Sequence, residues 1–231
     1  MDDIIQTQEA LSVAIIMDGN RRWAKEKGLA SFLGHRAGYD TLRNVLMWSK
    51  DAGVKYLTVY AFSTENWNRS EEEINYLFGL FQQMISDVVA DAKASNMRIF
   101  FAGERSRFPT HIISAIEHAE KETGACTAFT LCIALSYGGR TEIIDAIHRI
   151  PKETISEITE EAFAKLLWTK DIPDPDIIIR TSGEERLSNF LPWQSVYSEL
   201  FFTKTLWPDF SQQELLNILM EYKTRDRRIG A

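Results

Sequence analysis

Short apolar runs alternate with amphipathic stretches along the whole chain of 231 residues, and this alternation constrains the fold more than any other feature. The apolar runs predict six strands, near residues 12–17, 55–62, 97–102, 128–135, 176–180 and 199–202. Helical periodicity predicts helices near 22–27, 36–52, 71–95, 110–123, 140–150, 160–168 and 211–223. Strands that alternate with helices predict an α/β fold, with a central, mostly parallel six-stranded sheet flanked by helices on both faces.

Composition favours one ordinary globular domain. The chain contains no Pro- or Gly-rich linker, low-complexity tract or internal repeat, so we expect residues 1–231 to form a single domain. Hydrophobic residues make up 45% and charged residues 26%, which is typical of a soluble protein with a sizeable core. The formal charge of −7 argues against a protein that coats nucleic acid. An anionic ligand would therefore need a local cluster of arginines.

Cysteine usage and the N-terminal sequence indicate the compartment. Cys126 and Cys132 have no metal-type spacing around them, and we expect both to be reduced, as in a cytoplasmic protein. The N-terminal sequence MDDIIQTQEA is acidic and lacks the basic-then-apolar layout of a signal peptide. No apolar run approaches the roughly 20 residues of a membrane span. We expect a cytoplasmic protein that can still work at a membrane surface.

The helix expected at 71–95 is the clearest single element. Ser70 and Glu73 form a capping-box pattern at its start. One wide face of the helix is apolar, formed by Ile74, Leu77, Phe78, Phe81, Met84, Ile85, Val88 and Ala92. Packing on the sheet explains most of this face. A helix of about twice the mean length can also wall an elongated hydrophobic pocket.

Polar groups follow three of the expected strands at the point where each strand ends. The first strand is followed by DGNRRW (18–23), the second by STENWNR (63–69) and the fifth by RTSGEERLSN (180–189). Ligands of open parallel sheets bind beyond the carboxyl ends of the strands. Arginine side chains match phosphate oxygens, and Asp18 is a hard oxygen ligand that suits Mg²⁺. These residues predict a site for a phosphate-rich ligand with a metal.

Each of these residues also has an ordinary structural interpretation. A single arginine after a strand is most often a surface or salt-bridge residue, and Trp23 and Trp67 are most often packing residues. Glu199 stands among apolar neighbours in YSELFF and is suited to accept a structural hydrogen bond. His35, in GHRAG, is suited to a helix start without any ligand.

Five motifs of this chain resemble those of the cis-prenyltransferases, the undecaprenyl diphosphate synthase family. They are AIIMDGNRRWA, GHRAGY, YAFSTENWNR, YGGR, and RTSGEERLSNFLPWQSVYSEL with WPDF, and they span Val13 to Gly230 in the family's order. The resemblance implies a homodimer with a hydrophobic tunnel. It also implies Mg²⁺-dependent addition of isopentenyl diphosphate to an allylic diphosphate, such as farnesyl diphosphate, with each new double bond Z.

The resemblance also implies roles for individual residues. Asp18 would bind the metal and assist the departing diphosphate, and Asn66 would help to remove the proton. The allylic substrate would be held by Gly19, Asn20, Arg21, Arg22 and Trp23, with His35 nearby. The residues that line the site beside Asn66 would be Ser63, Thr64, Glu65, Trp67 and Arg69.

A second group of implied roles concerns isopentenyl diphosphate and the dimer. Isopentenyl diphosphate would be bound by the stretch that contains Arg180, Arg186, Leu187 and Ser188. Glu199 would contact the metal, either from its own subunit or across the dimer. Arg228 and Gly230 resemble the family's closing motif, which can reach into the neighbouring subunit's active site.

Four positions depart from the family pattern. Arg21 stands where many bacterial members have a second glycine, and Ser31 replaces an arginine. Cys132 and Ser136 stand where asparagines are common. We expect these departures to affect substrate preference more than reaction class.

Three alternative functions are open at this point. A short-chain Z-prenyl diphosphate synthase would share the same motifs, since the sequence fixes neither the product length nor the allylic starter. A non-catalytic subunit of a heteromeric enzyme is disfavoured, because Asp18, Asn66 and the motif from Arg180 to Ser188 are all present. A nucleotide-binding α/β module is disfavoured by the lack of GxxxxGK[ST] and GxGxxG motifs.

Overall fold

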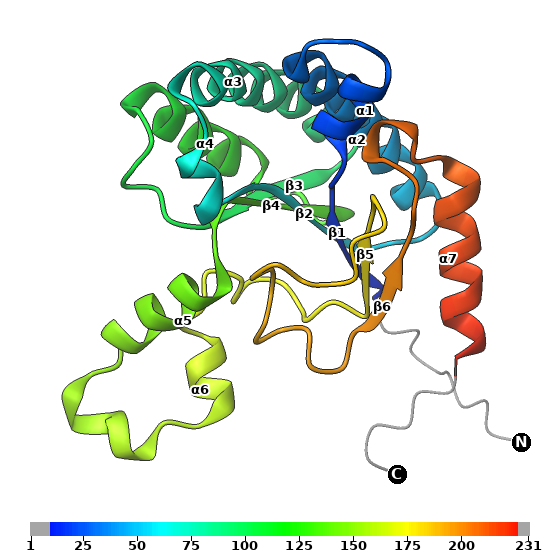
Figure 1. The fold of residues 1–231 in the computed structure, drawn as a ribbon. Coiled ribbons are helices and arrows are strands. Elements are labelled where there is room, and N and C mark those ends of the chain that lie inside the picture. The colour runs from blue at the N-terminus through cyan, green and yellow to red at the C-terminus, as the bar shows by residue number, and fades with distance from the viewer. Residues whose placement is uncertain (1–9, 226–231) are drawn as a thin grey trace, which may run out of the picture.

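The computed structural model describes residues 10–225 of the chain. Six strands form one sheet in the order β3-β4-β2-β1-β5-β6, and all neighbouring pairs are parallel (Figure 1). The strands are β1 (Ser12–Ile16), β2 (Tyr56–Ser63), β3 (Met97–Ala102), β4 (Phe129–Tyr137), β5 (Ile177–Arg180) and β6 (Glu199–Phe202). The six predicted strands are confirmed, and this sheet is fully parallel where the sequence predicted a mostly parallel one.

Seven α-helices and three short 3₁₀ helices connect the strands in the described residues. The α-helices are α1 (Asn20–Glu26), α2 (Ser31–Asp51), α3 (Glu71–Ala94), α4 (Thr110–Thr123), α5 (Gly139–His148), α6 (Glu160–Ala164) and α7 (Gln212–Thr224). The 3₁₀ helices are η1 (Thr64–Asn68), η2 (Lys152–Glu157) and η3 (Trp207–Asp209). Within residues 10–225, no helix is both long and apolar enough to cross a membrane.

Helix α2 begins at Ser31, five residues before the predicted start at 36. Two glycines, Gly34 and Gly38, lie inside this helix and let α1 approach closely. A Cβ on Gly34 would lie 2.0 Å from the carbonyl oxygen of Asn20, and one on Gly38 would lie 2.1 Å from the Asn20 Oδ1. The glycines therefore serve helix packing, and His35 lies within the first turns of the helix.

Helix α6 ends at Ala164, four residues before the predicted end at 168. Beyond it, the Trp168 indole donates a hydrogen bond to Asp145 Oδ2 at 2.6 Å. The backbone N–H and the hydroxyl of Thr169 both donate to the buried Glu142 Oε1, at 3.2 and 3.3 Å. These tertiary hydrogen bonds replace those of another helical turn and end the helix early.

The two faces of the sheet are covered differently. Helices α2, α3, α4 and α7 cover one face, where side chains such as Ile15, Val59 and Ile133 belong to the main core (Figure 1). The other face carries the small residues Ala14, Ala102 and Ala134, and it packs against Phe190 and Leu191 of the segment after β5. This segment therefore covers the second core, while the sheet as a whole is flanked by helices as predicted. Short alanine side chains leave room for an irregular segment to pack directly on the strands.

Candidate active site

Strands β2, β1 and β5 are neighbours in the sheet, so their carboxyl ends lie side by side. Two adjoining cavities open there, of about 300 and 180 Å³. The larger is lined by Met17, Asp18, Gly19, Asn20, Arg21, Arg22, His35 and Arg69. The smaller shares several of these residues and adds Ile16, Tyr60, Ala61, Ser63, Asn66, Leu77 and Arg180. We call the two together the mouth. The structure thus brings together the polar groups of three strand ends.

The backbone of Asp18 is fixed by a hydroxyl on the neighbouring strand end. The Asp18 N–H donates to Thr181 Oγ1 at 2.9 Å, and the Thr181 hydroxyl donates back to the Asp18 carbonyl at 2.7 Å. The Trp207 N–H also donates to the Asp18 carbonyl, at 3.0 Å. This double link between the ends of β1 and β5 holds the carboxylate in place while its side chain remains 37% exposed.

Arg180 is the buried cation of the mouth, with a side chain only 5% exposed. Its Nη2 donates to Asp18 Oδ2 at 2.8 Å, and its Nη1 donates to Ser188 Oγ at 2.7 Å. Nη1 also donates to the carbonyl of Arg186. These contacts hold the guanidinium in one orientation before any ligand arrives, which is the arrangement that favours recognition of a diphosphate.

Gly19 is required at the turn between β1 and α1. Its φ of +108° lies in the left-handed region that favours glycine. A Cβ there would also lie 3.0 Å from Leu206 Cδ2 and 3.1 Å from Ser182 Cβ. Arg21 and Arg22, which follow the turn, are both exposed to solvent. Arg22 donates to the Ser182 carbonyl at 2.8 Å, so one of its guanidinium nitrogens is fixed at the rim of the mouth.

Glu73 joins His35 and Arg69 on the side of the mouth formed by α2 and α3. Its Oε1 accepts from Arg69 Nη1 at 3.0 Å and lies 3.2 Å from His35 Nε2. Burial, together with the nearby Arg69 charge, lowers the pKa of His35 below its ordinary value, although the contact with Glu73 opposes this shift. Since burial and Arg69 outweigh Glu73, we treat His35 as neutral at pH 7, where its Nε2–H donates to Glu73.

Asn66 lies in η1 at the start of the β2–α3 connection. Its Oδ1 accepts from the Ser63 N–H at 3.1 Å, and the Ser63 side chain accepts from the Asn66 backbone N–H. This reciprocal cap fixes both residues beside the smaller cavity. The same bonds account for the short 3₁₀ helix, which the sequence pattern did not predict.

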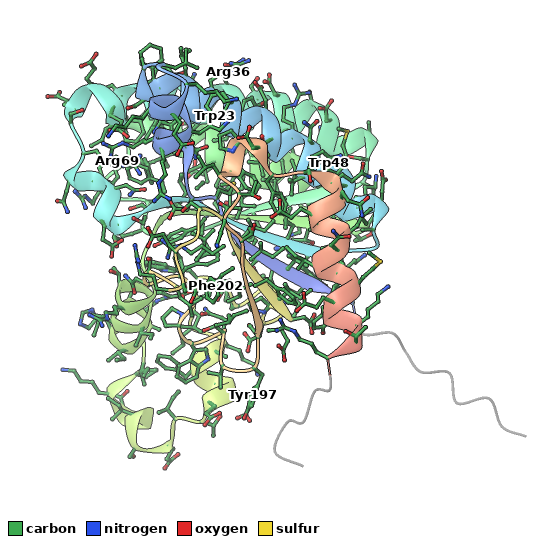
Figure 2. All side chains as sticks on the ribbon, turned by 45° about the vertical axis from the view of Figure 1, so that its right-hand side comes forward. Trp23, Arg36, Trp48, Arg69, Tyr197 and Phe202 are labelled. Atoms are coloured by element: carbon green, nitrogen blue, oxygen red, sulfur yellow. The ribbon has the colours of Figure 1, made fainter. Side chains whose placement is uncertain are left out.

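Several residues implied by the resemblance do not line the mouth. The Trp23 indole donates to Asp209 Oδ1 at 2.7 Å, and Glu65 accepts from Asn189 Nδ2 at 3.1 Å. Thr64 lies against Gly138, where a Cβ would come 2.5 Å from its hydroxyl. Figure 2 shows Trp23 and Arg69 at the same end of the molecule. These three residues shape the surroundings of the mouth in this structure.

Three residues of the stretch after β5 also lie off the mouth. The Arg186 side chain is 61% exposed and pairs with Glu184 at 2.5 Å. Leu187 packs against the second core, and Ser188 contributes its hydroxyl to Arg180. Of the residues from 180 to 188, Arg180 thus lines the mouth, and Arg186 and Ser188 hold its guanidinium through a carbonyl and a hydroxyl.

Trp67 is held in a cluster of aromatic rings with Phe62, Phe78 and Phe108. Its indole donates to Ser136 Oγ at 2.9 Å. Ser136 has a φ of +51°, a conformation that asparagine adopts more readily than serine. Ser136 therefore combines a left-handed backbone with the acceptor for the Trp67 indole.

Glu199 lies at the amino end of its strand, β6, whereas Asp18 follows the carboxyl end of β1. It begins β6 in register with Ile177, whereas Asp18 follows Ile16, which is in register with Arg180. Three residues of strand, roughly 10 Å, separate these levels. Glu199 Oε2 instead accepts from Arg225 Nη1 at 2.6 Å. Within one subunit, therefore, Glu199 and Asp18 do not form a common metal site.

Other described residues offer no further metal cluster, since none of residues 10–225 forms a group of three or more His, Cys, Asp and Glu side chains that could hold an ion. Asp18 alone provides one carboxylate at the mouth, and Mg²⁺ commonly takes one or two carboxylates together with substrate phosphates. The donor set therefore fits a magnesium ion that is held mainly by its substrate. The predicted Arg228 and Gly230 lie outside the described residues.

An apolar passage continues from the mouth between α2 and α3. Its first part, the proximal slot, has a volume of about 60 Å³ and is lined by Ala61, Tyr39, Leu42, Phe81 and Met84, among others. Between the same two helices, one turn further on, lies the separate distal cavity of about 760 Å³. Its apolar lining is formed by Leu46, Met47, Val88, Met97 and Phe129, and its other seven lining residues are polar or charged. The two compartments lie along the passage that the sequence predicted as a hydrophobic tunnel.

A parallel sheet with arginines at three adjacent strand ends, and an apolar slot behind them, suits a ligand with an anionic head and an apolar chain. The chain matches the family model described as putative undecaprenyl diphosphate synthase over residues 16–230. It is 47% identical to the isoprenyl transferase of Thermotoga maritima, covering 94% of this chain and 95% of that one. It is 49% identical to that of Fusobacterium nucleatum, covering 94% of each. The chain belongs to the undecaprenyl diphosphate synthase family.

Two solved structures are similar in fold. Lavandulyl diphosphate synthase from Lavandula x intermedia, solved with dimethylallyl diphosphate, gives a TM-score of 0.91 at 34% identity, covering 95% of this chain and 98% of that one. A probable undecaprenyl diphosphate synthase from Campylobacter jejuni gives 0.82 at 31% identity, covering 96% and 99%. The predicted fold class and family are therefore confirmed.

Two residues at the site were not predicted from the sequence. Glu73 was recognised only as a helix cap, and its backbone N–H does donate to Ser70 Oγ at 3.3 Å. Its spacing of four residues from Arg69 on a helix start was the available signal for their ion pair. Asn189 accepts from the Arg140 N–H through Oδ1 at 2.9 Å and donates to Glu65, and nothing in the local pattern indicated this bridging role.

Proposed function

We propose that the chain is a cis-prenyltransferase that adds isopentenyl diphosphate units to an allylic diphosphate, such as farnesyl diphosphate, with Z double bonds. The product would be a polyprenyl diphosphate of undecaprenyl type. The observation that carries this proposal is the continuity of a polar mouth with an apolar passage. Met17, Asn20 and His35 line both the mouth and the proximal slot, so a ligand with a charged head and an apolar chain would fit across them.

The two diphosphates would occupy different sides of the mouth. Gly19, Arg21 and Arg22 would hold the allylic diphosphate, because the glycine lets backbone groups approach, Arg21 is exposed at the mouth, and Arg22 is anchored at its rim by the Ser182 carbonyl. Arg180, already oriented by Asp18 and Ser188, would bind isopentenyl diphosphate. This division would place the isopentenyl double bond beside the reacting carbon of the allylic chain.

The reaction would then transfer the allylic group to isopentenyl diphosphate. A carbon–carbon bond forms from the isopentenyl double bond to the allylic carbon, the allylic carbon–oxygen bond breaks, and diphosphate leaves. A proton is lost from the isopentenyl unit, where Asn66 would assist. The apolar slot behind the mouth would exclude water from the electron-poor carbon. Bound Mg²⁺ would neutralise part of the diphosphate charge, with Asp18 as its protein ligand.

A short-chain Z-prenyl diphosphate synthase is the second candidate. The small volume of the proximal slot, about 60 Å³, favours it, as does the likeness to lavandulyl diphosphate synthase. The distal cavity favours the longer product, because it offers about 760 Å³ along the same pair of helices. A non-catalytic role is disfavoured, since Asp18, Asn66 and Arg180 all line the mouth.

Product analysis tests the proposal and separates these candidates. Purified protein with labelled isopentenyl diphosphate, Mg²⁺ and either dimethylallyl or farnesyl diphosphate should give labelled prenyl diphosphates, and EDTA should abolish them. Several added units with Z geometry support the long-chain enzyme, and one or two support the short-chain enzyme. Absence of any transfer with every starter would contradict both.

The proposed enzyme acts as a cytoplasmic homodimer that can touch a membrane surface to release its product. Exposed apolar side chains on and before the edge strand β6 support an interface there, namely Val196 (70% exposed), Tyr197 (68%), Leu200 (37%) and Phe202 (37%). Figure 2 labels Tyr197 and Phe202. Sedimentation should show a dimer, and Tyr197→Lys should weaken it, whereas Met47→Lys, at a methionine on α2 that is 56% exposed, should not.

Subunit mixing tests the proposed role of Arg228 and Gly230 across the dimer. Asp18→Ala subunits mixed with subunits truncated after Lys223 should regain activity if the tail acts in the neighbouring subunit. The truncated subunit keeps its own Asp18 and receives an intact tail from its partner. Random mixing sets a ceiling of about a quarter of wild-type activity. No recovery beyond the two mutants' own activities would discard the model.

A further inference from the structure

The proximal slot and the distal cavity are separated by one helical turn of packed side chains on each wall. Leu42 and Met84 line the slot, and Leu46 and Val88, four residues further along α2 and α3, line the cavity. Residues four apart lie on the same face of a helix, about one turn or 5.4 Å along its axis. All four belong to the same core cluster. A chain that fills the slot therefore meets packed side chains before it reaches the larger space.

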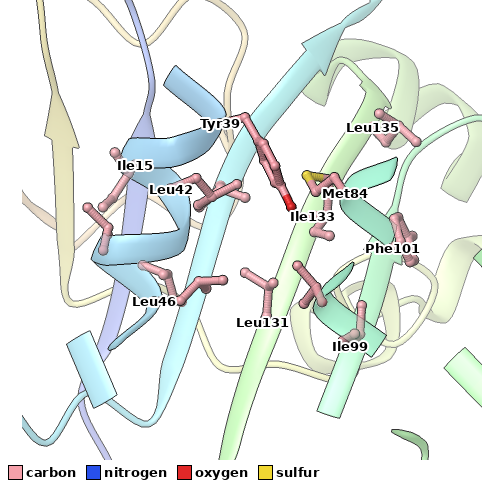
Figure 3. Close-up of a cluster of buried hydrophobic side chains, with 14 of the residues drawn as sticks. Ile15, Tyr39, Leu42, Leu46, Met84, Ile99, Phe101, Leu131, Ile133 and Leu135 are labelled. Carbon is pink, nitrogen blue, oxygen red and sulfur yellow. The ribbon is translucent and has the colours of Figure 1, made fainter. Parts of the chain in front are cut away.

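Tyr39 spans the gap between the two helices at this boundary. Its ring is 5% exposed, lines the slot, and is drawn between Leu42 and Met84 in Figure 3. Its hydroxyl donates to Asp87 Oδ2 on α3 at 2.8 Å. Asp87 directly precedes Val88 of the distal cavity. The ring of Tyr39 thus lines the slot, and its hydroxyl is bonded to the residue next to Val88, where the distal cavity begins.

Two further cross-helix contacts flank this hydrogen bond. Arg36 donates to Gln83 at 2.8 Å on one side, and Arg43 lies 3.6 Å from Asp91 on the other. Both pairs are exposed, and exposed polar pairs contribute little because solvent competes for them. The Tyr39–Asp87 bond is partly buried, with a charged acceptor, and such bonds are the stronger ones. Of these three cross-helix contacts, the Tyr39–Asp87 hydrogen bond therefore contributes most to holding α2 and α3 together.

We propose that Tyr39, held by its hydrogen bond to Asp87, is the gate between the proximal slot and the distal cavity and limits how far a prenyl chain extends. This proposal rests on the proposed prenyl transfer. A growing chain must displace the ring from the boundary and break the hydrogen bond to enter the cavity. Diphosphates that end within the slot leave the gate closed. Tyr39 lines the slot and neither cavity of the mouth, so it determines product length and not the bond-forming step.

The experiment compares product ladders of the wild type, Tyr39→Phe, Tyr39→Ala and Asp87→Ala with labelled isopentenyl diphosphate. Tyr39→Phe removes the hydroxyl and keeps the ring, Asp87→Ala removes the acceptor from the other helix, and Tyr39→Ala removes the ring. All three should lengthen the longest product by at least one isoprene unit, with the largest shift in Tyr39→Ala. Gln83→Ala is the matched control, because it removes the neighbouring exposed contact one turn away, and its ladder should equal that of the wild type.

A binding measurement gives a second readout that does not depend on elongation. Calorimetry should show that Tyr39→Phe and Asp87→Ala bind geranylgeranyl diphosphate more tightly relative to farnesyl diphosphate. The ratio of dissociation constants should change by about tenfold, which is what loss of a hydrogen bond to a charged acceptor typically amounts to. The side chains of Asp87 and Gln83 line neither the mouth nor the slot, so the rate of the first condensation should change less than twofold in Asp87→Ala and Gln83→Ala, both checked for folding by circular dichroism.

The outcomes separate the gate from the underlying activity. If the wild type transfers no isopentenyl unit, both the proposed function and the proposed role of Tyr39 are wrong. If the wild type elongates and the three gate variants keep its ladder and its binding ratio, only the gate is overturned. A longer product in Tyr39→Ala alone would assign the limit to the size of the ring and overturn the role of the hydrogen bond.

Discussion

The mouth and the passage behind it are built in opposite ways. At the mouth, Arg180, Asp18 and Asn66 are fixed by hydrogen bonds before any ligand is present, and open volume already exists. In the proximal slot, side chains are packed at the boundary and little volume is open. The charged end of a ligand therefore meets a preformed site, whereas its apolar end must displace packed side chains. Substitutions at the mouth should therefore change rates, and substitutions in the slot should change products.

The largest expected effect follows loss of the Asp18 carboxylate. Asp18→Ala should lower turnover by about 10²–10³, the usual consequence of removing one electrostatic stabiliser. The fold should survive, because the backbone bonds with Thr181 do not involve the carboxylate. Steady-state kinetics in saturating Mg²⁺ checks the rate, and circular dichroism checks the fold. More than a tenth of wild-type activity would show that the mouth does not depend on this carboxylate.

A smaller effect is expected when Arg180 is changed to lysine. Lysine keeps the charge but cannot reach Asp18 and Ser188 together, so kcat/KM for isopentenyl diphosphate should fall about 10- to 100-fold. The matched control is Arg186→Lys, whose side chain is 61% exposed and should change kcat/KM less than threefold, since exposed ion pairs contribute little. Equal losses in the two variants would contradict a preformed role that is specific to Arg180.

In the passage, Ala61→Leu should shorten the product and leave the first condensation intact. Ala61 lines both the smaller cavity of the mouth and the proximal slot, so a larger side chain fills space that the chain must cross. Chromatography of labelled products should show loss of the longest species. An unchanged ladder would mean that the chain takes a route other than the slot.

The smallest expected effect concerns the pH dependence of stability. Burial and Arg69 hold the pKa of His35 below its ordinary value of 6.5, so folding favours the neutral ring. This contribution is present above pH 6.5 and is lost as the pH falls through the lower folded-state value. Between pH 7 and pH 5 the wild type should lose more free energy of unfolding than His35→Gln. Urea denaturation measures this free energy at both pH values. An equal loss in the wild type and in His35→Gln would contradict the prediction.

The sequence predicted the strands and the meeting of their polar ends because both depend on local patterns and on one rule of sheet geometry. It did not predict the cover of the second sheet face, where an irregular segment packs on Ala14 and Ala134. Nor did it predict that the Trp23 indole would bond to Asp209, or that Glu73 would contact His35. These are contacts between residues distant in sequence, and no local period encodes them. The predicted start of α2 was five residues too late for a related reason. Glycines usually indicate a break in a helix, but here Gly34 and Gly38 lie inside α2 and allow close contact with α1.

The order of strands has a consequence for synthesis of the chain. Strand β1 pairs with β2 on one side and with β5 on the other, and β5 follows β1 by about 160 residues. At 5–20 residues per second, the ribosome needs roughly 8–32 s to make that stretch. During this interval one edge of the central strand has no sheet partner, and Asp18 has neither Thr181 nor Arg180 beside it. The mouth is therefore incomplete until β5 has been made, and until then the unpaired edge of β1 is open to pairing with another chain.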